Sequence, residues 1–340
     1  LRKNLFSSQT KNYVKKFIEI EKKNDSTIIE IHNRPSYIQI LSKEIKKKIL
    51  VLYFHNDPLS MDGSQTIQER KILLKTCYKI IFNSSWSKKR FLEGLENKFV
   101  NSDKLLIFHQ SASKGSINLI DKKEKWITFV GKLNKAKGYD IFGQSILKIL
   151  NEYKDWKSIV VGDEPREKHI FKHKNLKIYN FKENSYVLNL LKKTSIFVAC
   201  SRWEEPFGRS SLEASSLGCA TIITNRGGLL ETTKYPIIID KLDSKILYNQ
   251  IKKLIDNPNI RKRYQSLNYK SFFLTHGYVS KIIDKVRNNI VSNLKINKFN
   301  INRNAKLKII HITNFNQRYY GRLQYNTGIR LNNGLIRLGH

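Results

Sequence analysis

Cysteine is scarce in this sequence, and long apolar runs are absent from it. The three cysteines, Cys77, Cys200 and Cys219, are widely spaced and lie in or beside apolar segments. This spacing argues against a disulfide framework or a metal site and favours buried thiols in a reducing compartment, with a nucleophilic role for Cys200 as the alternative. No apolar run reaches the ~20 residues that a membrane-spanning helix needs, so the sequence predicts none.

Acidic residues are also few, because the sequence has 28 of them against 63 lysines and arginines, a formal net charge of +35. Such a charge is typical of proteins that bind nucleic acid or an anionic membrane surface. The lysines are spread along the whole chain, however, without zinc-ligand spacing or an aromatic-rich RNA-binding signature. We therefore interpret the charge mainly as compositional bias, with contact with anionic lipid as a secondary role, and expect no nucleic acid as a partner.

Short apolar runs of β-forming residues alternate with helical patterns along most of the chain. This alternation is typical of an α/β fold with parallel, doubly wound sheets. The expected strands are residues 27–32, 49–54, 79–82, 105–108, 126–130, 158–161, 176–181, 196–199, 220–224, 237–239 and 307–312. The expected helices are residues 8–24, 36–48, 65–76, 85–93 with Ser85 as its candidate cap, 185–193, 210–217, 243–256 and two more between 259 and 293.

The most informative stretch is residues 196–231, where two buried strands flank a polar loop and a helix. Pro206 suits the entry to that helix, because its missing N–H would have had no partner there, and Gly218 can end it. Ligands of open α/β sheets bind at the carboxyl ends of strands, and a helix N-terminus favours an anionic or hydroxyl-rich ligand. Glu205 and Glu213 fall in this region, and carboxylates suit sugar and ribose hydroxyls because they accept hydrogen bonds strongly.

The same stretch resembles retaining glycosyltransferases of family 4, whose signature is E-P-F-G-x-x-x-L-E-A, followed by G-x-P-V and a G-G-x-x-E turn. Residues 205–208, 212–214, Gly218 and 227–231 match this pattern, and Ala220 replaces the proline. The resemblance implies the GT-B fold, in which two Rossmann-like doubly wound domains face each other across a cleft. An ordinary βαβ unit with two solvated glutamates is the alternative interpretation.

A second match, residues 131–140, resembles the family's G-R-L-x-x-x-K-G-x-D. Glycine allows a close approach of the backbone, and the two cations of the pattern would neutralise a diphosphate and its developing leaving-group charge. Lys137 matches the family's lysine, whereas Lys132 replaces its arginine and binds phosphate as a point charge instead of bidentately. Residues 161–165 resemble the family's V-G-x-G-P with Glu164 at the second glycine, where we expect a turn residue.

Two histidines follow expected strands in the first half of the chain. His55, in VLYFHNDP, resembles the histidine of the family's T-x-H-x segment, which implies contact with the donor sugar near the reaction centre. His32, in IIEIHNRP, matches the preceding strand, where a structural or acceptor-lining role is more usual. Local hydrogen bonding alone is the alternative for both. The family's I-P-N-G-x-D segment is replaced by residues 107–111, IFHQS.

The resemblance implies that the protein transfers a sugar from a nucleotide diphosphate sugar to a hydroxyl acceptor, with retention at the anomeric carbon and without a metal ion or other cofactor. The residues that it implies for donor binding are Lys132, Lys137, Phe207, Gly208 and Glu213. Of these, Glu213 would hold the ribose. The residues that it implies for catalysis are His55 and Glu205, both at the donor sugar.

The resemblance also implies an acceptor that is a glycan or a lipid-linked precursor of bacterial surface polysaccharide or lipopolysaccharide. We therefore expect a cytoplasmic protein in peripheral contact with the inner face of the membrane through its basic surface. Two alternatives remain open. One is a basic nucleic-acid-binding protein on a degenerate enzyme fold, which the net charge of +35 motivates, and the other is a GT-B sugar epimerase or phosphorylase.

Three parts are expected along the chain. Residues 1–118 would form an acceptor-side domain truncated at its start, because no glycine-rich loop precedes its first strand. Residues 119–294 would form the nucleotide-sugar-binding domain. Residues 295–340 would be a linker and the first βα unit of a second glycosyltransferase module, so that the chain is a fragment of a tandem enzyme. A permuted arrangement, in which the strand at 307–312 completes the first domain, is the alternative.

Overall fold

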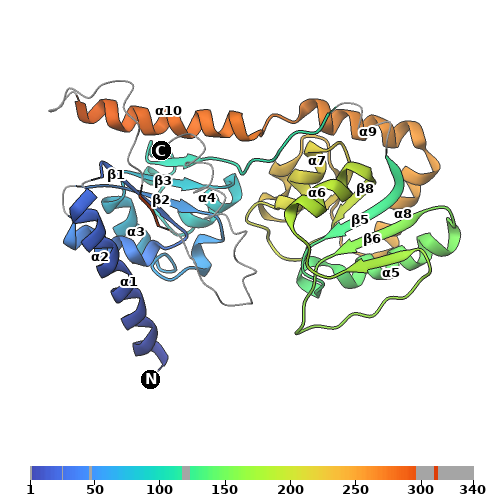
Figure 1. The fold of residues 1–340 in the computed structure, drawn as a ribbon, viewed down its shortest axis with the longest axis horizontal. Helices are drawn as coiled ribbons and strands as arrows, with labels where there is room; N and C mark the ends of the chain where they lie inside the picture. Colours follow the sequence, from blue (N-terminus) through green and yellow to red (C-terminus); the bar gives the residue numbers. More distant parts are fainter. Residues whose placement is uncertain (1, 25, 46–47, 117–122, 296–309, 313–340) are drawn as a thin grey trace. The chain divides into compact units, whose positions relative to one another are not determined.

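The computed structural model of the protein describes residues 2–24, 26–45, 48–116, 123–295 and 310–312. It has two compact units, of which the first combines residues 1–108 with 281–340 and the second comprises residues 109–280 (Figure 1). The expected boundaries at 118 and 294 both lie further along the chain than these. Each unit has its own parallel sheet covered by helices, which confirms the α/β fold class expected from the sequence.

The sheet of the first unit has five parallel strands. In spatial order they are β11 (Ile310–Ile312), β1 (Ile28–His32), β2 (Ile49–Phe54), β3 (Lys79–Phe82) and β4 (Leu105–Ile107). Strand β11 pairs with β1 in parallel, with Ile310 opposite Ile29. This pairing brings a strand from the chain's tail into the first sheet, as in the permuted alternative. The helix expected after that strand lies outside the described residues.

Helices cover both faces of this sheet. On one face lie α1 (Arg2–Asn24), α2 (Pro35–Glu44), α3 (Ile67–Thr76) and α4 (Ser85–Leu92), and α10 (His276–Lys295) covers the other. Side chains alternate along the strands, so Leu52 and Phe54 of β2 face the first set of helices, whereas Val51 and Tyr53 face α10. Two short 3₁₀ helices, η1 (Pro58–Ser60) and η2 (Asn97–Phe99), lie in the connections.

Capping side chains fix the starts of two of these helices. Thr66 and Glu69 form a reciprocal capping box at the start of α3. Helix α4 is capped by Ser84, whose hydroxyl accepts a hydrogen bond from the backbone N–H of Ser87. The prediction that Ser85 is the cap is therefore wrong by one residue, because Ser85 is already the first helical residue.

The sheet of the second unit has six parallel strands. In spatial order they are β10 (Ile237–Ile239), β9 (Ala220–Thr224), β8 (Thr194–Ala199), β5 (Glu124–Val130), β6 (Lys157–Val161) and β7 (Leu176–Tyr179). Counted from β5 as the first strand, this is the order found in dinucleotide-binding Rossmann folds. The order reverses between β5 and β8, and sheets of this kind bind ligands at the carboxyl ends of the strands on either side of the reversal.

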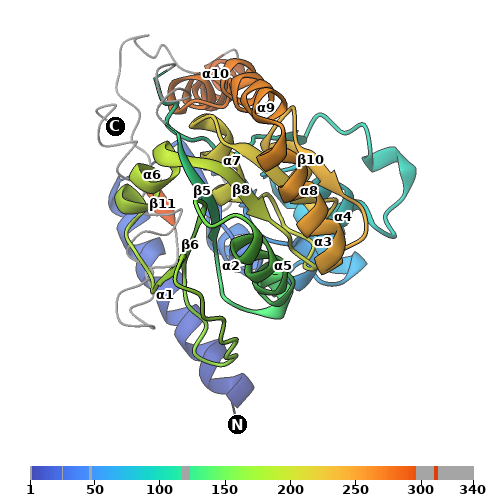
Figure 2. The same cartoon turned by 90° about the vertical axis from the view of Figure 1, so that its right-hand side faces the viewer.

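Helices α5 (Tyr139–Glu152) and α8 (Ser244–Asp256) pack on one face of this sheet, and α6 (Asn184–Lys193) and α7 (Arg209–Ser216) pack on the other (Figure 2). Helix α5 is not among the helices predicted from the sequence. Helix α9 (Pro258–Ser271) packs against β9, and the connections contain the 3₁₀ helices η4 (Lys135–Lys137) and η5 (Gly227–Thr232). Within the described part of the chain, no helix is long and apolar enough to cross a membrane.

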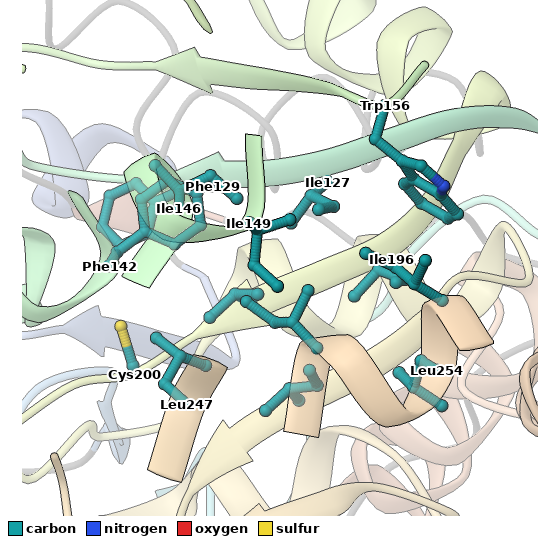
Figure 3. Packing of buried hydrophobic residues seen from close by; sticks show 14 of the residues in the cluster. Ile127, Phe129, Phe142, Ile146, Ile149, Trp156, Ile196, Cys200, Leu247 and Leu254 are labelled. Atoms are coloured by element: carbon teal, nitrogen blue, oxygen red, sulfur yellow. The ribbon is translucent and has the colours of Figure 1, made fainter. Parts of the chain in front are cut away.

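An apolar core fills the space between the second sheet and helices α5 and α8, and Cys200 is part of it (Figure 3). The Cys200 side chain is fully buried, and burial raises the pKa of its thiol to about 12. Cys77 and Cys219 are buried free thiols as well. The prediction of buried thiols is confirmed, and a nucleophilic role for Cys200 is unsupported because a thiol in this environment stays protonated at neutral pH.

Candidate functional site

Two loops meet at the carboxyl ends of β5 and β8, where the strand order reverses. The basic loop, residues 131–138, follows β5, and the acidic loop, residues 200–208, follows β8. The backbone N–H groups of Arg202 and Trp203 both donate to the carbonyl of Ala136, at 2.9 and 3.0 Å. The two segments for which the sequence predicts a diphosphate site and a sugar site therefore lie against each other.

An ion pair connects the two loops, because the ammonium nitrogen of Lys137 lies 2.5 Å from Oε1 of Glu205. The Glu205 side chain is 10% exposed and the Lys137 side chain 32%, so solvent reaches the pair mainly at the lysine. The hydroxyl of Ser201 donates a second hydrogen bond to the same carboxylate oxygen, also at 2.5 Å. A lysine ammonium has three donor hydrogens, so Lys137 can keep Glu205 and bind an anion at the same time.

The basic loop is held in one shape by its own residues. Asn134 caps η4, since its Oδ1 accepts a hydrogen bond from the backbone N–H of Lys137 at 3.0 Å. Gly138 follows with a φ of 72°, and a Cβ there would lie 1.9 Å from the carbonyl oxygen of Cys200. Only glycine fits at this position, because a side chain would push the basic and acidic loops apart.

The acidic loop leads into helix α7 through Gly208, which is the N-cap in a left-handed conformation with φ 105° and ψ 67°. The helix begins at Arg209, so the prediction that Pro206 enters the helix is wrong, and this proline lies within the loop. Among the described residues no side chain caps this end, and the first N–H groups of a helix lack partners inside it. Phe207 is 2% exposed, so its ring is part of the protein interior.

The far end of α7 has the form that the sequence predicts. Gly218 has a φ of 71°, and its N–H donates to the carbonyl of Ser215 at 3.0 Å. The N–H of Cys219 donates to the carbonyl of Ala214, also at 3.0 Å. These two hydrogen bonds form a Schellman motif, and the prediction that Gly218 ends the helix is confirmed.

Glu213 lies in the second turn of α7 and is 6% exposed. Its Oε1 accepts hydrogen bonds from Nη2 of Arg209 at 2.9 Å and from Nδ2 of Asn184 at 3.0 Å. Burial raises the pKa of this carboxyl above its ordinary value, and Arg209 and Asn184 oppose that shift. Because Glu205 is buried as well, the alternative of two solvated glutamates is wrong. A buried carboxylate with a perturbed pKa, as at Glu213, is a candidate for a binding site.

Lys132 is exposed at the start of the basic loop and interacts electrostatically with Glu164, for which the sequence predicts only a turn role. Glu164, from the connection after β6, accepts hydrogen bonds from Nε and Nη2 of Arg166 at 2.7 and 2.8 Å. Arg166, with a smaller contribution from Lys132, holds the pKa of Glu164 at about 2. Glu164 also accepts a hydrogen bond from Nδ2 of Asn134 at 3.3 Å. It is therefore a buried support of the basic loop and more than the turn residue expected.

His109, which belongs to the segment that departs from the family pattern, packs beside the acidic loop in the second unit. Its Nε2 lies 2.8 Å from Oε2 of Glu231, and its ring centroid lies 5.6 Å from that of Phe207. Glu231 is part of η5, and in the same segment the N–H of Gly228 donates to the carbonyl of Glu205 at 2.7 Å. Three segments that are distant in the sequence therefore meet around Phe207.

His55 lies in the first unit, directly after β2, and is paired with the other histidine that the sequence singles out. Its Nε2 lies 2.9 Å from Nδ1 of His32. Its backbone N–H donates to Oδ1 of Asn33 at 2.7 Å, and its carbonyl accepts from Nδ2 of Asn83 at 2.9 Å. Asn33 has a φ of 55°, which asparagine tolerates better than most residues and which is frequent at functional sites. The two histidines are therefore one cluster.

A buried charge cluster supports this histidine pair. The Arg287 guanidinium, on α10, donates to Oε2 of Glu30 at 2.6 Å and to Oε1 at 2.9 Å, and the Tyr53 hydroxyl donates to Oε1 at 3.0 Å. The Tyr53 ring stacks on His32 with 4.3 Å between centroids. Burial and the charge of Glu30 raise the pKa of Tyr53 well above its ordinary value. Sequence reasoning missed this cluster, although a glutamate between the isoleucines of the buried strand β1 is a signal of it.

Both loops of the candidate site lie within a segment that matches the model of a known sequence family. Residues 112–271 match the family model described as Glycosyl transferases group 1. Most of the second unit is therefore similar to glycosyl transferases of group 1. Its matched segment includes Lys132, Lys137 and residues 205–213, whereas His55 and His109 lie outside it.

Curated relatives align with a larger part of the chain, at low sequence identity. Spore coat protein SA of Bacillus subtilis (strain 168) is 24% identical over 273 residues, which is 71% of this chain and 72% of the relative. The putative glycosyltransferase YtcC of the same organism is 25% identical over 256 residues, 67% of this chain and 63% of the relative. The lipopolysaccharide core biosynthesis mannosyltransferase LpsB of Rhizobium meliloti (strain 1021) is 27% identical over 135 residues, 36% of this chain and 38% of the relative.

Solved structures resemble the chain over both units. Anabaena Alr3699/HepE in complex with UDP and glucose has a TM-score of 0.65 and 17% identity, covering 82% of this chain and 81% of that one. A glycosyltransferase from Rickettsia africae ESF-5 also has a TM-score of 0.65, with 16% identity over 83% of this chain and 81% of that one. This likeness concerns the fold alone, and it confirms the expected GT-B class with two Rossmann-like domains.

Proposed function

We propose that this chain moves a sugar from a nucleotide diphosphate sugar to a hydroxyl group of an acceptor, with retention at the anomeric carbon. The observation that carries the proposal is the Lys137–Glu205 ion pair at the strand reversal of the second sheet, next to the start of α7, which no described side chain caps. A cation, helix N–H groups and a buried carboxylate at one place suit a ligand that is anionic at one end and hydroxyl-rich at the other.

The diphosphate would be bound without a metal ion. Lys132 and Lys137 are the two cations of the basic loop that match the family pattern, and the N–H groups after Gly208 add the positive end of the α7 dipole. Charge on the diphosphate grows as its bond to the anomeric carbon breaks, so fixed donors at this place stabilise the transition state more than the ground state.

The two buried carboxylates would hold the rest of the donor. Glu213 would accept hydrogen bonds from the ribose hydroxyls, and Glu205 would accept them from hydroxyls of the sugar. The shared hydrogen bonds with Lys137 and Ser201 keep Glu205 in one orientation. His55, in the first unit, would contact the donor sugar, with His32 as its hydrogen-bond partner.

The acceptor would be a glycan or a lipid-linked precursor in the synthesis of a surface polysaccharide or lipopolysaccharide. The relatives support this class, because one of them is a mannosyltransferase of lipopolysaccharide core biosynthesis. The enzyme would act in the cytoplasm. Its net charge of +35 favours peripheral contact with an anionic membrane on the inner face.

The direct test is nucleotide binding by the full chain, measured by thermal shift and calorimetry with UDP, GDP, ADP and their sugars, without added metal. The Anabaena structure, which contains UDP and glucose, favours UDP as the first probe. We expect one nucleotide to raise the melting temperature selectively and expect the shift to persist in EDTA.

Lys137→Ala should weaken that binding by about 1.5–3 kcal/mol, the contribution of a charge-assisted hydrogen bond. Lys135→Ala is the matched control, because Lys135 lies exposed in the same turn and its contact with Glu167 uses its backbone N–H. No shift with any nucleotide would contradict the proposal, and steeply salt-dependent binding of duplex DNA or RNA instead would support the nucleic-acid alternative.

A further inference from the structure

In the connection after β6, a buried carboxylate, Glu164, occupies the position where the family pattern has a glycine. The Glu164 side chain is 5% exposed. A buried charge is costly unless it is paired and hydrogen-bonded. Arg166, two residues further on, supplies both requirements with a two-point contact to the Glu164 oxygens at 2.7 and 2.8 Å. The low pKa of Glu164, about 2, means that the carboxylate stays ionised at neutral pH and keeps the guanidinium in place.

This pair also lies against the basic loop. Glu164 Oε2 accepts hydrogen bonds from both Arg166 Nη2 and Asn134 Nδ2, so the guanidinium and the Asn134 amide are neighbours. Asn134 in turn caps η4 through the N–H of Lys137. A second carboxylate of the same connection, Glu167, accepts a hydrogen bond from the N–H of Lys135 at 2.8 Å. The Arg166 guanidinium is therefore attached, through Glu164, to the basic loop that carries Lys132 and Lys137.

The side of the guanidinium that Glu164 uses is the edge formed by Nε and Nη2. A guanidinium has a second edge, formed by Nη1 and Nη2, that matches the oxygens of a phosphate. The Arg166 side chain is 76% exposed although Glu164 beneath it is buried, so a ligand can reach this group from solvent. A carboxylate on one edge and a phosphate on the other is compatible with the five donors of the guanidinium.

We infer that Arg166 is a further donor-binding residue, whose guanidinium contacts the diphosphate of the nucleotide sugar while Glu164 positions it. This inference rests on the proposed function. It also accounts for two departures from the family pattern together. The pattern has an arginine in the basic loop where this chain has Lys132, and it has a glycine after β6 where this chain has Glu164. The guanidinium is supplied from the neighbouring connection instead, and Glu164 is the residue that holds it there.

The test is calorimetry on the full chain with the nucleoside diphosphate that binds best among UDP, GDP and ADP, and with the corresponding nucleoside. Arg166→Ala should weaken diphosphate binding about tenfold, and leave nucleoside binding unchanged. Lys168→Ala is the matched control, because it removes an exposed cation from the same connection. The double variant Lys132→Arg with Arg166→Ala should regain most of the lost affinity, because it returns a guanidinium to the basic loop.

Each failure has a separate meaning. Unchanged diphosphate affinity in Arg166→Ala, with a wild-type chain that binds the nucleotide, would overturn this inference and leave the proposed function standing. An equal loss of nucleoside affinity would also overturn it, since that result would show a structural role only. A wild-type chain that binds none of the nucleotides would overturn the proposed function and the inference with it.

Discussion

Replacing Glu213 with glutamine should lower the affinity for the nucleotide without lowering the stability of the protein. Glutamine keeps the volume of the buried side chain, and its carbonyl oxygen can still accept from Arg209 and Asn184. Burial raises the pKa of Glu213 above its ordinary value of 4.5, so the folded protein holds this proton more tightly than the unfolded chain. The ionised carboxylate therefore costs stability, and the cost develops as pH rises from 4.5 through the raised pKa.

Above the raised pKa the whole cost is present in the wild type and absent from the variant. The melting temperature of Glu213→Gln should consequently be equal to that of the wild type or higher. Arg209 loses its charged partner, but its side chain is 32% exposed and water can solvate it. Binding changes in the opposite direction, because hydrogen bonds from ribose hydroxyls to a charged acceptor are worth about 1.5–3 kcal/mol, a loss of tenfold or more in affinity.

Calorimetry with the nucleoside diphosphate, together with thermal unfolding at several pH values, would measure both effects. Nucleotide affinity of the wild type should fall as pH is lowered through the raised pKa of Glu213, whereas the affinity of the variant should not follow this titration. Unchanged affinity in Glu213→Gln would refute the ribose assignment. A melting temperature several degrees below the wild type at pH 7 would refute the argument that burial of the charge is a net cost.

Two further predictions concern residues beside the basic and acidic loops. Tyr139→Phe should stabilise the protein by about 1 kcal/mol, because the Tyr139 hydroxyl is buried without a hydrogen-bond partner among the described residues; a lower melting temperature in the variant would contradict this. Gly227→Ala should destabilise the protein by at least about 1 kcal/mol and reduce nucleotide binding, because Gly227 has a φ of 57° and a Cβ would lie 2.3 Å from the Glu205 carbonyl oxygen. Gly277→Ala in α10 is the control for thermal unfolding and calorimetry, since a Cβ there meets nothing within 4 Å, and equal effects of the two substitutions would disprove the argument.

Strand positions could be predicted from the sequence with few errors, because a buried parallel strand is an apolar run bounded by turn residues. Strands β2, β3, β9 and β10 have the predicted ends. Helix starts were less predictable, since the N-cap depends on the backbone angles of one residue among several suitable ones. Ser84 and Ser85 are equivalent candidates by sequence, and only the structure shows that the first of them caps α4.

The contacts between motifs could not be predicted, because they depend on how distant segments meet. Lys137 and Glu205 belong to separate motifs in the sequence, and the fold brings them together as an ion pair across the strand reversal. The two histidines of the first unit likewise become a hydrogen-bonded pair. The ion pair between Glu30 and Arg287 joins residues 257 positions apart, and no local pattern contains that information.

Two positions of the second unit that depart from the family pattern, Glu164 and His109, have specific partners in this chain. Glu164 occurs together with Arg166, which binds it at two points. His109 occurs together with a hydrogen bond to Glu231 and a ring contact with Phe207. A substitution that only weakened an inherited site would leave a buried charge or an imidazole unpaired, whereas these two are paired beside the loops of the candidate site. Both altered positions therefore contact the loops of the candidate site, and we predict that the donor preference of the proposed enzyme depends on these contacts.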